Sequence, residues 1–212
     1  MFKRLALILL LLPALSALSA LHAQTRKTSN PYSGDLSIFE TPGRDERLQI
    51  NRVMDILEIG PGKNVADIGA GSGWFTVRAA KRVGESGKVY AVDINPEAIK
   101  FINERVKKEN LTNVTAILSP ADSAPLPGKV DVVFILKTYH EIAEPITLLR
   151  NLRPSLAAKA KLGIIDRNGN GTDHGIDPKV IIREADEAGY RMVEQYDFVK
   201  DGMDYFLVFI PK

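Results

Sequence analysis

The sequence predicts an α/β fold with a doubly wound sheet that is mostly parallel and has an antiparallel terminal strand. From about residue 60 onward, apolar runs of strand length alternate with amphipathic runs of helix length. This alternation is typical of a parallel sheet covered by helices on both faces. The last two apolar runs, at 192–199 and 205–210, flank a short turn at Asp201 and Gly202 and must therefore pair antiparallel.

Each element has its own local signal. The first helix is expected at 45–59, where four apolar residues share one helical face before glycine and proline end it at 60–62. Asn95–Pro96 and Asp177–Pro178 each supply a cap and a first-turn proline for a later helix. The other elements are expected as strands at 64–68, 88–94, 113–118, 130–136 and 161–166, and as helices at 74–83, 96–110, 144–152 and 178–188.

The beginning of the chain differs from the rest. Lys3 and Arg4 precede an apolar run that has no charge until Arg26, as in a secretory signal peptide cleaved after Ala23. The run is shorter than the roughly 20 residues that a membrane-spanning helix needs, and an uncleaved anchor is the alternative. We expect a signal peptide or N-terminal anchor at 1–23, an irregular arm at 24–44 and one globular domain at 45–212. The protein is then exported, periplasmic or secreted, and touches a membrane only through an uncleaved N-terminal segment.

Charge and cysteine content exclude several classes of function. Without Lys3 and Arg4, 26 basic residues balance 26 acidic ones. The mature domain therefore has no net positive field to attract nucleic acid, and no nucleic-acid partner is expected. The chain has no cysteine, which excludes disulfides, thiolate metal sites and a cysteine nucleophile.

The stretch VADIGAGSGWF at 65–75 places a glycine loop after a buried strand. A phosphate-binding loop would need lysine after its last glycine, where Trp74 stands, and the dinucleotide pattern G-x-G-x-x-G is also missed. The remaining pattern, D-x-G-x-G-x-G, has an acid before the loop. That acid would repel a pyrophosphate and suit a ligand with a cationic amine.

With these motifs, 45–212 resembles the class I S-adenosylmethionine-dependent methyltransferases. VADIGAGSG resembles the first motif of that family, and YAVDI, ending at Asp93 and Ile94, resembles the second. The resemblance implies a Rossmann-like sheet, S-adenosyl-L-methionine as cofactor and methyl transfer by direct displacement. It implies that Asp93 bonds the ribose hydroxyls and that Ile94 flanks the adenine. The residues implied in cofactor binding are Asp67, Gly69, Ala70, Gly71, Gly73, Asp93, Ile94 and Asp122.

Asp122 is the least regular member of this set. Pro120 occupies the position where many members of the family carry an acid that bonds the adenine amino group. Either Asp122 or the backbone takes that role.

Catalytic candidates follow the fourth strand, in LKTYHEI. His140 is expected as a general base, because imidazole accepts a proton near neutral pH, and Tyr139 accompanies it. The alternative is that His140 caps or packs the next helix while Tyr139 covers the cofactor. A polar segment after the fifth strand, with Asp166 and His174, either rims the same cleft or is an ordinary loop. No two candidate ligands share helical or short-loop spacing, so no metal site is expected.

The resemblance also implies that the arm before the first helix closes over the cofactor, with Tyr32, Phe39 and Arg44 as contacts. The acceptor is expected to be a small molecule or an exposed side chain. A non-catalytic nucleoside-binding module on the same scaffold is the alternative, since S-adenosylmethionine is made in the cytosol. A nicotinamide-dependent oxidoreductase is disfavoured by Trp74 in the glycine loop.

Overall fold

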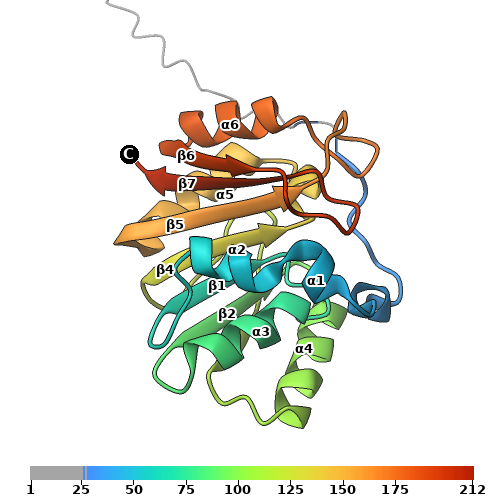
Figure 1. The fold of residues 1–212 in the computed structure, drawn as a ribbon, viewed down its shortest axis with the longest axis vertical. Helices are drawn as coiled ribbons and strands as arrows, with labels where there is room; N and C mark the ends of the chain where they lie inside the picture. Colours follow the sequence, from blue (N-terminus) through green and yellow to red (C-terminus); the bar gives the residue numbers. More distant parts are fainter. Residues whose placement is uncertain (1–25, 27) are drawn as a thin grey trace, which may run out of the picture.

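The structure is a computed structural model that describes Arg26 and residues 28–212, so the expected signal peptide or anchor at 1–23 lies outside the described residues. One sheet of seven strands has the order β3-β2-β1-β4-β5-β7-β6, and helices cover both of its faces (Figure 1). The strands are β1 Asn64–Ile68, β2 Lys88–Asp93, β3 Val114–Leu118, β4 Val130–Leu136, β5 Leu156–Asp166, β6 Tyr190–Tyr196 and β7 Tyr205–Pro211. The α-helices are α1 Arg44–Leu48, α2 Ile50–Ile56, α3 Trp74–Val83, α4 Pro96–Lys108, α5 Pro145–Leu152 and α6 Pro178–Glu187. In the described part of the chain, no helix has the length and apolar character to cross a membrane.

The strand directions confirm the expected fold class. Neighbouring strands from β3 to β5 are parallel, whereas β7 is antiparallel to both β5 and β6. The antiparallel strand is therefore the last in the chain, but it lies between β5 and β6. The edge of the sheet on that side belongs to β6.

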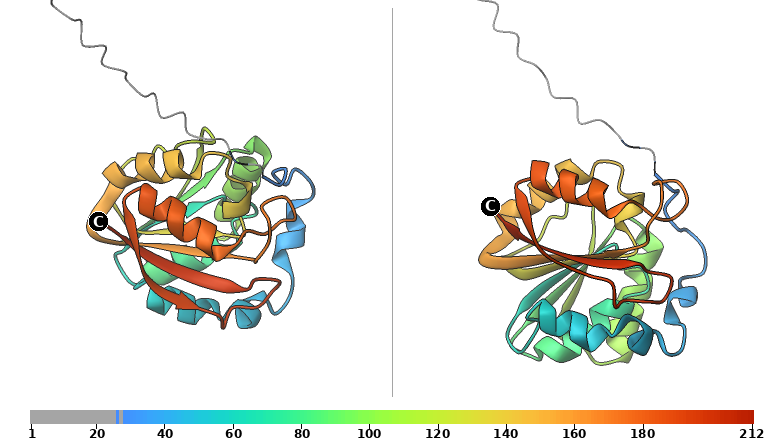
Figure 2. Two further views of the ribbon diagram at one scale, coloured as in Figure 1. Left: turned by 90° about the horizontal axis from the view of Figure 1, so that it is seen from above. Right: turned by 45° about the horizontal axis from the view of Figure 1, so that its top comes forward.

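Side chains of the central strands alternate between two apolar cores. In β4, Val132 and Phe134 pack with the helices α2 and α3, whereas Val133 and Ile135 pack with α5 and α6. All four β4 side chains are essentially inaccessible to solvent, as expected for a strand covered on both faces. The two views of Figure 2 show the sheet between these helical layers.

The helix expected at 45–59 is broken at Gln49, which has a left-handed backbone with φ 48°. A continuous helix would place Leu48 and Ile50 about 200° apart around its axis. The break allows both side chains to be buried, Leu48 at 0% and Ile50 at 2% exposure. The segments α1 and α2 thus cover the sheet with two differently oriented apolar faces.

The arm lies across the carboxyl ends of the parallel strands (Figure 1). It is mostly irregular, as expected, and contains one 3₁₀ turn, η1, at Leu36–Glu40. The Arg26 guanidinium anchors its start, because it donates to Ile142 O at 2.9 Å and pairs with Glu184 at 2.8 Å. The arm therefore covers the edge of the sheet where the strand-to-helix loops converge.

Candidate active site

A cavity of about 670 Å³ opens at the carboxyl ends of the parallel strands. Its walls come from the arm, the glycine loop, the end of β2, the turn after β4 and the loop after β5. The volume lies within the range of about 300–1,000 Å³ typical of small-molecule sites. Doubly wound sheets bind ligands at this edge, where the strand order reverses, here between β1 and β4.

The glycine loop brings bare backbone to the cavity. Gly69 and Gly71 have φ of 72° and 54°, a region that glycine enters without steric cost. The Gly71 N–H donates to Asp93 Oδ2 at 2.8 Å, and the Asn95 N–H donates to Asp93 Oδ1 at 2.9 Å. These bonds hold the Asp93 carboxylate against the cavity, while its remaining lone pairs can accept from a ligand diol.

Asp67 is a buried carboxyl group at the end of β1. It accepts a hydrogen bond from the Thr76 hydroxyl at 2.6 Å and also lines the cavity. Burial, assisted by the nearby Asp93 charge, raises the pKa of Asp67 to about 7. A cation placed beside Asp67 would favour its ionised form.

Most of the residues expected at the cofactor site line this cavity: Asp67, Gly69, Ala70, Gly71, Asp93 and Ile94. Ile94 is 45% exposed although it is a large apolar residue, so it offers an uncovered surface to a flat ring. Gly73 is not part of the lining. A Cβ there would lie 3.2 Å from Ile102, so Gly73 instead allows close packing of α3 on α4.

The structure does not place Asp122 in the wall of the cavity. Its neighbours Ala121 and Ser123 line the cavity, together with Ser119 and Pro120. The Asp122 carbonyl accepts from the Asn151 side chain, which fixes this loop to α5. The geometry favours the backbone and serines of this loop over Asp122 as partners for an adenine amino group.

The arm residues expected over the cofactor, Tyr32, Phe39 and Arg44, all line the cavity. The Glu40 carboxylate joins the arm to the glycine loop, because it accepts from Ser72 Oγ at 2.6 Å and pairs with Arg105 of α4. The cavity is therefore closed on this side by a segment tied to the loop beneath it.

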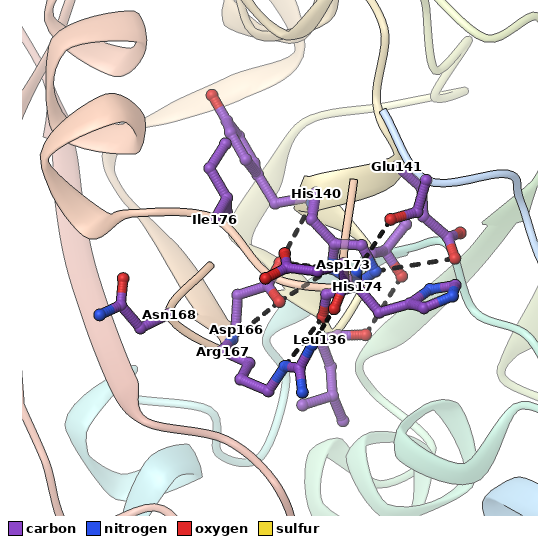
Figure 3. Close-up of polar contacts among 12 residues, drawn as sticks. Leu136, His140, Glu141, Asp166, Arg167, Asn168, Asp173, His174 and Ile176 are labelled. Carbon is purple, nitrogen blue, oxygen red and sulfur yellow. Dashed lines mark hydrogen bonds and ion pairs between the residues drawn. The ribbon is translucent and has the colours of Figure 1, made fainter. Parts of the chain in front are cut away.

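His140 and Asp166 form a buried pair at the opposite end of the cavity. His140 lies in the single turn η2 (Tyr139–Glu141), and Asp166 ends β5. Both Asp166 oxygens lie within 3.0 Å of His140 Nδ1, and the His140 and Arg167 N–H groups also donate to them. A carboxylate with these donors accepts the Nδ1 proton, which leaves the lone pair of Nε2 free. Figure 3 shows this pair at the centre of the polar cluster.

The structure contradicts the expectation that Tyr139 acts beside His140. The Tyr139 side chain is fully buried and its hydroxyl donates to Glu184 Oε2 at 3.0 Å, within the core under α6. Burial and the Glu184 charge raise the pKa of Tyr139 well above its usual value. Tyr139 therefore neither lines the cavity nor covers the cofactor, because consecutive residues of this turn point to opposite sides.

Glu141 and His174 complete the polar end of the cavity (Figure 3). Glu141 Oε1 lies 3.7 Å from His140 Nε2, and burial raises the pKa of Glu141 to about 7. His174, in the loop after β5, has its ring 5.9 Å from that of His140. The fold thus brings together three potential metal ligands that sequence spacing did not join.

The fold, the glycine loop and the placed acids define a class I S-adenosylmethionine-dependent methyltransferase. The family model described as "Methyltransferase domain" matches residues 59–193, and the chain belongs to this family. A crystal structure of a SAM-dependent methyltransferase from Aquifex aeolicus superposes with a TM-score of 0.75 at 27% identity. The matched region covers 85% of this chain and 100% of the Aquifex aeolicus chain.

Curated relatives match over shorter stretches. A protein-L-isoaspartate O-methyltransferase from Pyrococcus horikoshii is 29% identical over 103 residues, 48% of this chain and 45% of that protein. A probable cobalt-precorrin-6B C(15)-methyltransferase from Sulfolobus acidocaldarius is 43% identical over 76 residues, 35% of this chain and 40% of that protein. The chain thus spans less than half the length of these two relatives. The two relatives differ in the acceptor that their names give, and both are named as methyltransferases.

The residues of the cavity fit this cofactor. Asp93 would offer a carboxylate to the ribose hydroxyls, Ile94 an apolar face to the adenine, and Asp67 a carboxyl group to the amino cation of the methionine part. The glycine loop lets backbone approach the ligand where a side chain would fill the space.

Proposed function

We propose that this chain transfers the methyl group of S-adenosylmethionine to a small molecule or an exposed protein side chain whose acceptor atom carries a proton. The observation that carries the proposal is the His140–Asp166 pair, which directs a free imidazole lone pair into the acceptor end of the cavity. Protein side chains and small molecules are also the acceptor classes in the names of the isoaspartate and precorrin methyltransferases among the relatives. The balanced charge of residues 24–212 favours such acceptors over nucleic acid.

The cofactor supplies an activated methyl group when it is bound, so the protein mainly positions the acceptor. Alignment of reacting groups can contribute about 7–11 kcal/mol to the lowering of the barrier. Asp67, the glycine loop and Asp93 hold the cofactor end of the cavity, whereas His140 acts on the acceptor proton at the other end. The Asp166 carboxylate is a positioning group, because it orients the imidazole and does not reach the cavity itself.

The test is methyl transfer from S-adenosylmethionine with a radiolabelled methyl group to isoaspartyl peptides and to a panel of hydroxylated small molecules. With a hydroxylated substrate, whose acceptor oxygen carries a proton, His140→Gln should slow turnover by about 10²–10⁴-fold and leave cofactor affinity unchanged. An isoaspartyl carboxylate is already ionised near neutral pH, so its methylation should depend far less on His140. Tyr139→Phe is the matched neighbour, and it should retain turnover because its hydroxyl faces Glu184. Equal turnover of His140→Gln and the wild type would remove His140 from the reaction. No transfer to either acceptor class would contradict the proposed acceptors.

We further propose that the protein is exported, on the basis of the basic start and apolar run of its first 23 residues. Amino-terminal sequencing of the protein from its native host should begin at Gln24. A chain that retains Met1 in the cytosolic fraction would contradict export.

A further inference from the structure

We propose that His140, Glu141 and His174 bind a divalent transition-metal ion at the acceptor end of the cavity. One ligand atom from each of these side chains lies within 4.8 Å of the other two. Atoms that share one Zn²⁺ at about 2.0–2.2 Å lie roughly 3–3.5 Å apart, so the most distant pair needs to close by at most about 1.3–1.8 Å. His174 is exposed, and its side chain has room for that adjustment.

The hydrogen bonding of His140 is a second and independent indication. Its Nδ1 lies 2.9 and 3.0 Å from the two oxygens of Asp166, which has no solvent exposure. Metal-bound histidines almost always donate their other ring N–H to such a carboxylate or carbonyl, which fixes the ring and makes the ligand more basic. The free Nε2 is the atom that faces Glu141, 3.7 Å away (Figure 3).

The backbone conformation and hydrogen bonds of the loop after β5 fix the position of His174. The residue has a left-handed backbone with φ 58°, which is uncommon outside glycine. Its N–H donates to Ser29 Oγ of the arm at 2.9 Å, and its carbonyl accepts from the Arg167 guanidinium at 3.3 Å. These contacts direct the imidazole edge-on toward His140, with an angle of 87° between the rings.

Convergence of three groups favours a metal ion over a lone general base. A base needs only the His140–Asp166 pair, which leaves Glu141 and His174 without a use. Two neutral imidazoles with the carboxylates of Glu141 and Asp166 also balance the charge of a divalent cation. The mixed nitrogen and oxygen ligands suit Zn²⁺ or Fe²⁺, whereas Mg²⁺ and Ca²⁺ prefer sites made of oxygen alone.

The ion would have open positions toward the cavity, since only three protein ligands converge on it. It would therefore take an acceptor that coordinates metal through oxygen or nitrogen. In the metal-bound protein the Nε2 lone pair of His140 would be occupied by the ion, and the ion would replace His140 as the direct base by lowering the pKa of the bound acceptor, whose proton would pass to solvent. This deepens the proposed function and rests on it for the identity of the acceptor end. Binding of the ion itself can be measured without an acceptor.

The experiment is a calorimetric titration of the chelator-treated full chain with Zn²⁺, and with Mg²⁺ for comparison. The wild type should bind one Zn²⁺ per chain and bind Mg²⁺ far more weakly. Glu141→Gln and His174→Gln should each weaken Zn²⁺ binding at least tenfold, and Asp166→Asn by about 10–100-fold, the effect typical of groups that orient a ligand. Addition of Co²⁺ should give a visible absorption band that His174→Gln shifts.

The matched control is Glu144→Gln, the same substitution three residues after Glu141. Glu144 lies outside the lining of the cavity, and its carboxylate makes no hydrogen bond or ion pair with the described residues. This variant should bind Zn²⁺ as the wild type does. S-adenosylmethionine affinity, measured on every variant, reports that the fold is intact.

No stoichiometric Zn²⁺ binding, or equal binding by the wild type and by Glu141→Gln and His174→Gln, would overturn the metal site. If S-adenosylmethionine still binds and methyl transfer resists chelator, the proposed function stands and His140 acts directly as the base. If Zn²⁺ binds but no acceptor of the proposed classes is methylated, the metal site stands and the proposed acceptors fail.

Discussion

At the scale of single residues, we expect Asp67 to make cofactor binding depend on pH. Its carboxyl group is half protonated near pH 7 in the free protein, because burial raises its pKa to about 7. A methionine amino cation beside it favours the ionised form, so binding releases a proton below that pH. Affinity should therefore rise with pH between about 6 and 8, by at most about tenfold per unit, and then level off.

Calorimetry at pH 6.5 in two buffers of different ionisation enthalpy would detect the released proton. Asp67→Asn should remove the pH dependence, because the amide does not titrate, although it can still accept from Thr76. An affinity that is flat from pH 6 to 8 in the wild type would show that the cation does not lie at Asp67.

Single residues are also where sequence reasoning was weakest. Asp67 and Asp93 could be placed from their positions at the ends of two expected strands. Tyr139 and His140 could not be told apart, because a single 3₁₀ turn sends one side chain into the core and the other to the cavity. The His140–Asp166 hydrogen bond joins residues 26 positions apart in the sequence, and no local sequence pattern predicts it.

At the scale of the elements, the glycine loop is a tight fit between β1 and the turn after β4. An added Cβ at Gly69 would lie 2.8 Å from Thr138 Cβ, and the backbone there has φ 72°. Gly69→Ala should cost about 1–2 kcal/mol for the left-handed backbone and a further 1–3 kcal/mol for overpacking. It should also weaken cofactor binding, because the loop has to move.

Gly62→Ala separates the cost of the left-handed backbone from the cost of overpacking. Gly62 has φ 79°, but its added Cβ would meet only Ser86 Oγ at an ordinary 3.6 Å, and Gly62 does not line the cavity. This variant should show the backbone cost alone in denaturant unfolding and bind S-adenosylmethionine as the wild type does. Equal stability of the two variants would contradict the tight packing of Gly69 against Thr138.

The arm is the element that the sequence described least. Its composition predicted an irregular segment, which the structure shows apart from η1. Its path depends on contacts between distant residues, such as Ser29 with His174 and Glu40 with Ser72. Such contacts exist only after the sheet has formed, so the position of the arm over both ends of the cavity follows from tertiary structure.

At the scale of the whole molecule, the alternating pattern was sufficient to predict the sheet and its two helical layers. The apolar runs of β1, β4 and the second half of β5 are buried on both faces, which gives a strong local signal. The break at Gln49 and the insertion of β7 between β5 and β6 were not predictable in this way. Both depend on which surfaces remain to be covered once the central strands have paired.

The proposed cofactor and acceptor ends of the cavity are supplied by different strand ends. The carboxyl ends of β1 and β2 supply Asp67 and Asp93, and the loop after β1 supplies the glycines, whereas the segments after β4 and β5 supply His140 and His174. Substitutions at the cofactor end should change cofactor affinity, and those at the acceptor end should change turnover or metal binding. This division lets the proposals be tested separately.

The most direct test of the central claim is calorimetric titration of the full chain with S-adenosylmethionine, on the wild type, Asp93→Ala and Asp122→Ala. The wild type should bind one cofactor per chain. Asp93→Ala should lose about 1.5–3 kcal/mol of binding free energy, the range for hydrogen bonds to a charged group, and Asp122→Ala should bind as the wild type does. Unchanged affinity of Asp93→Ala would contradict the placement of the cofactor over the glycine loop.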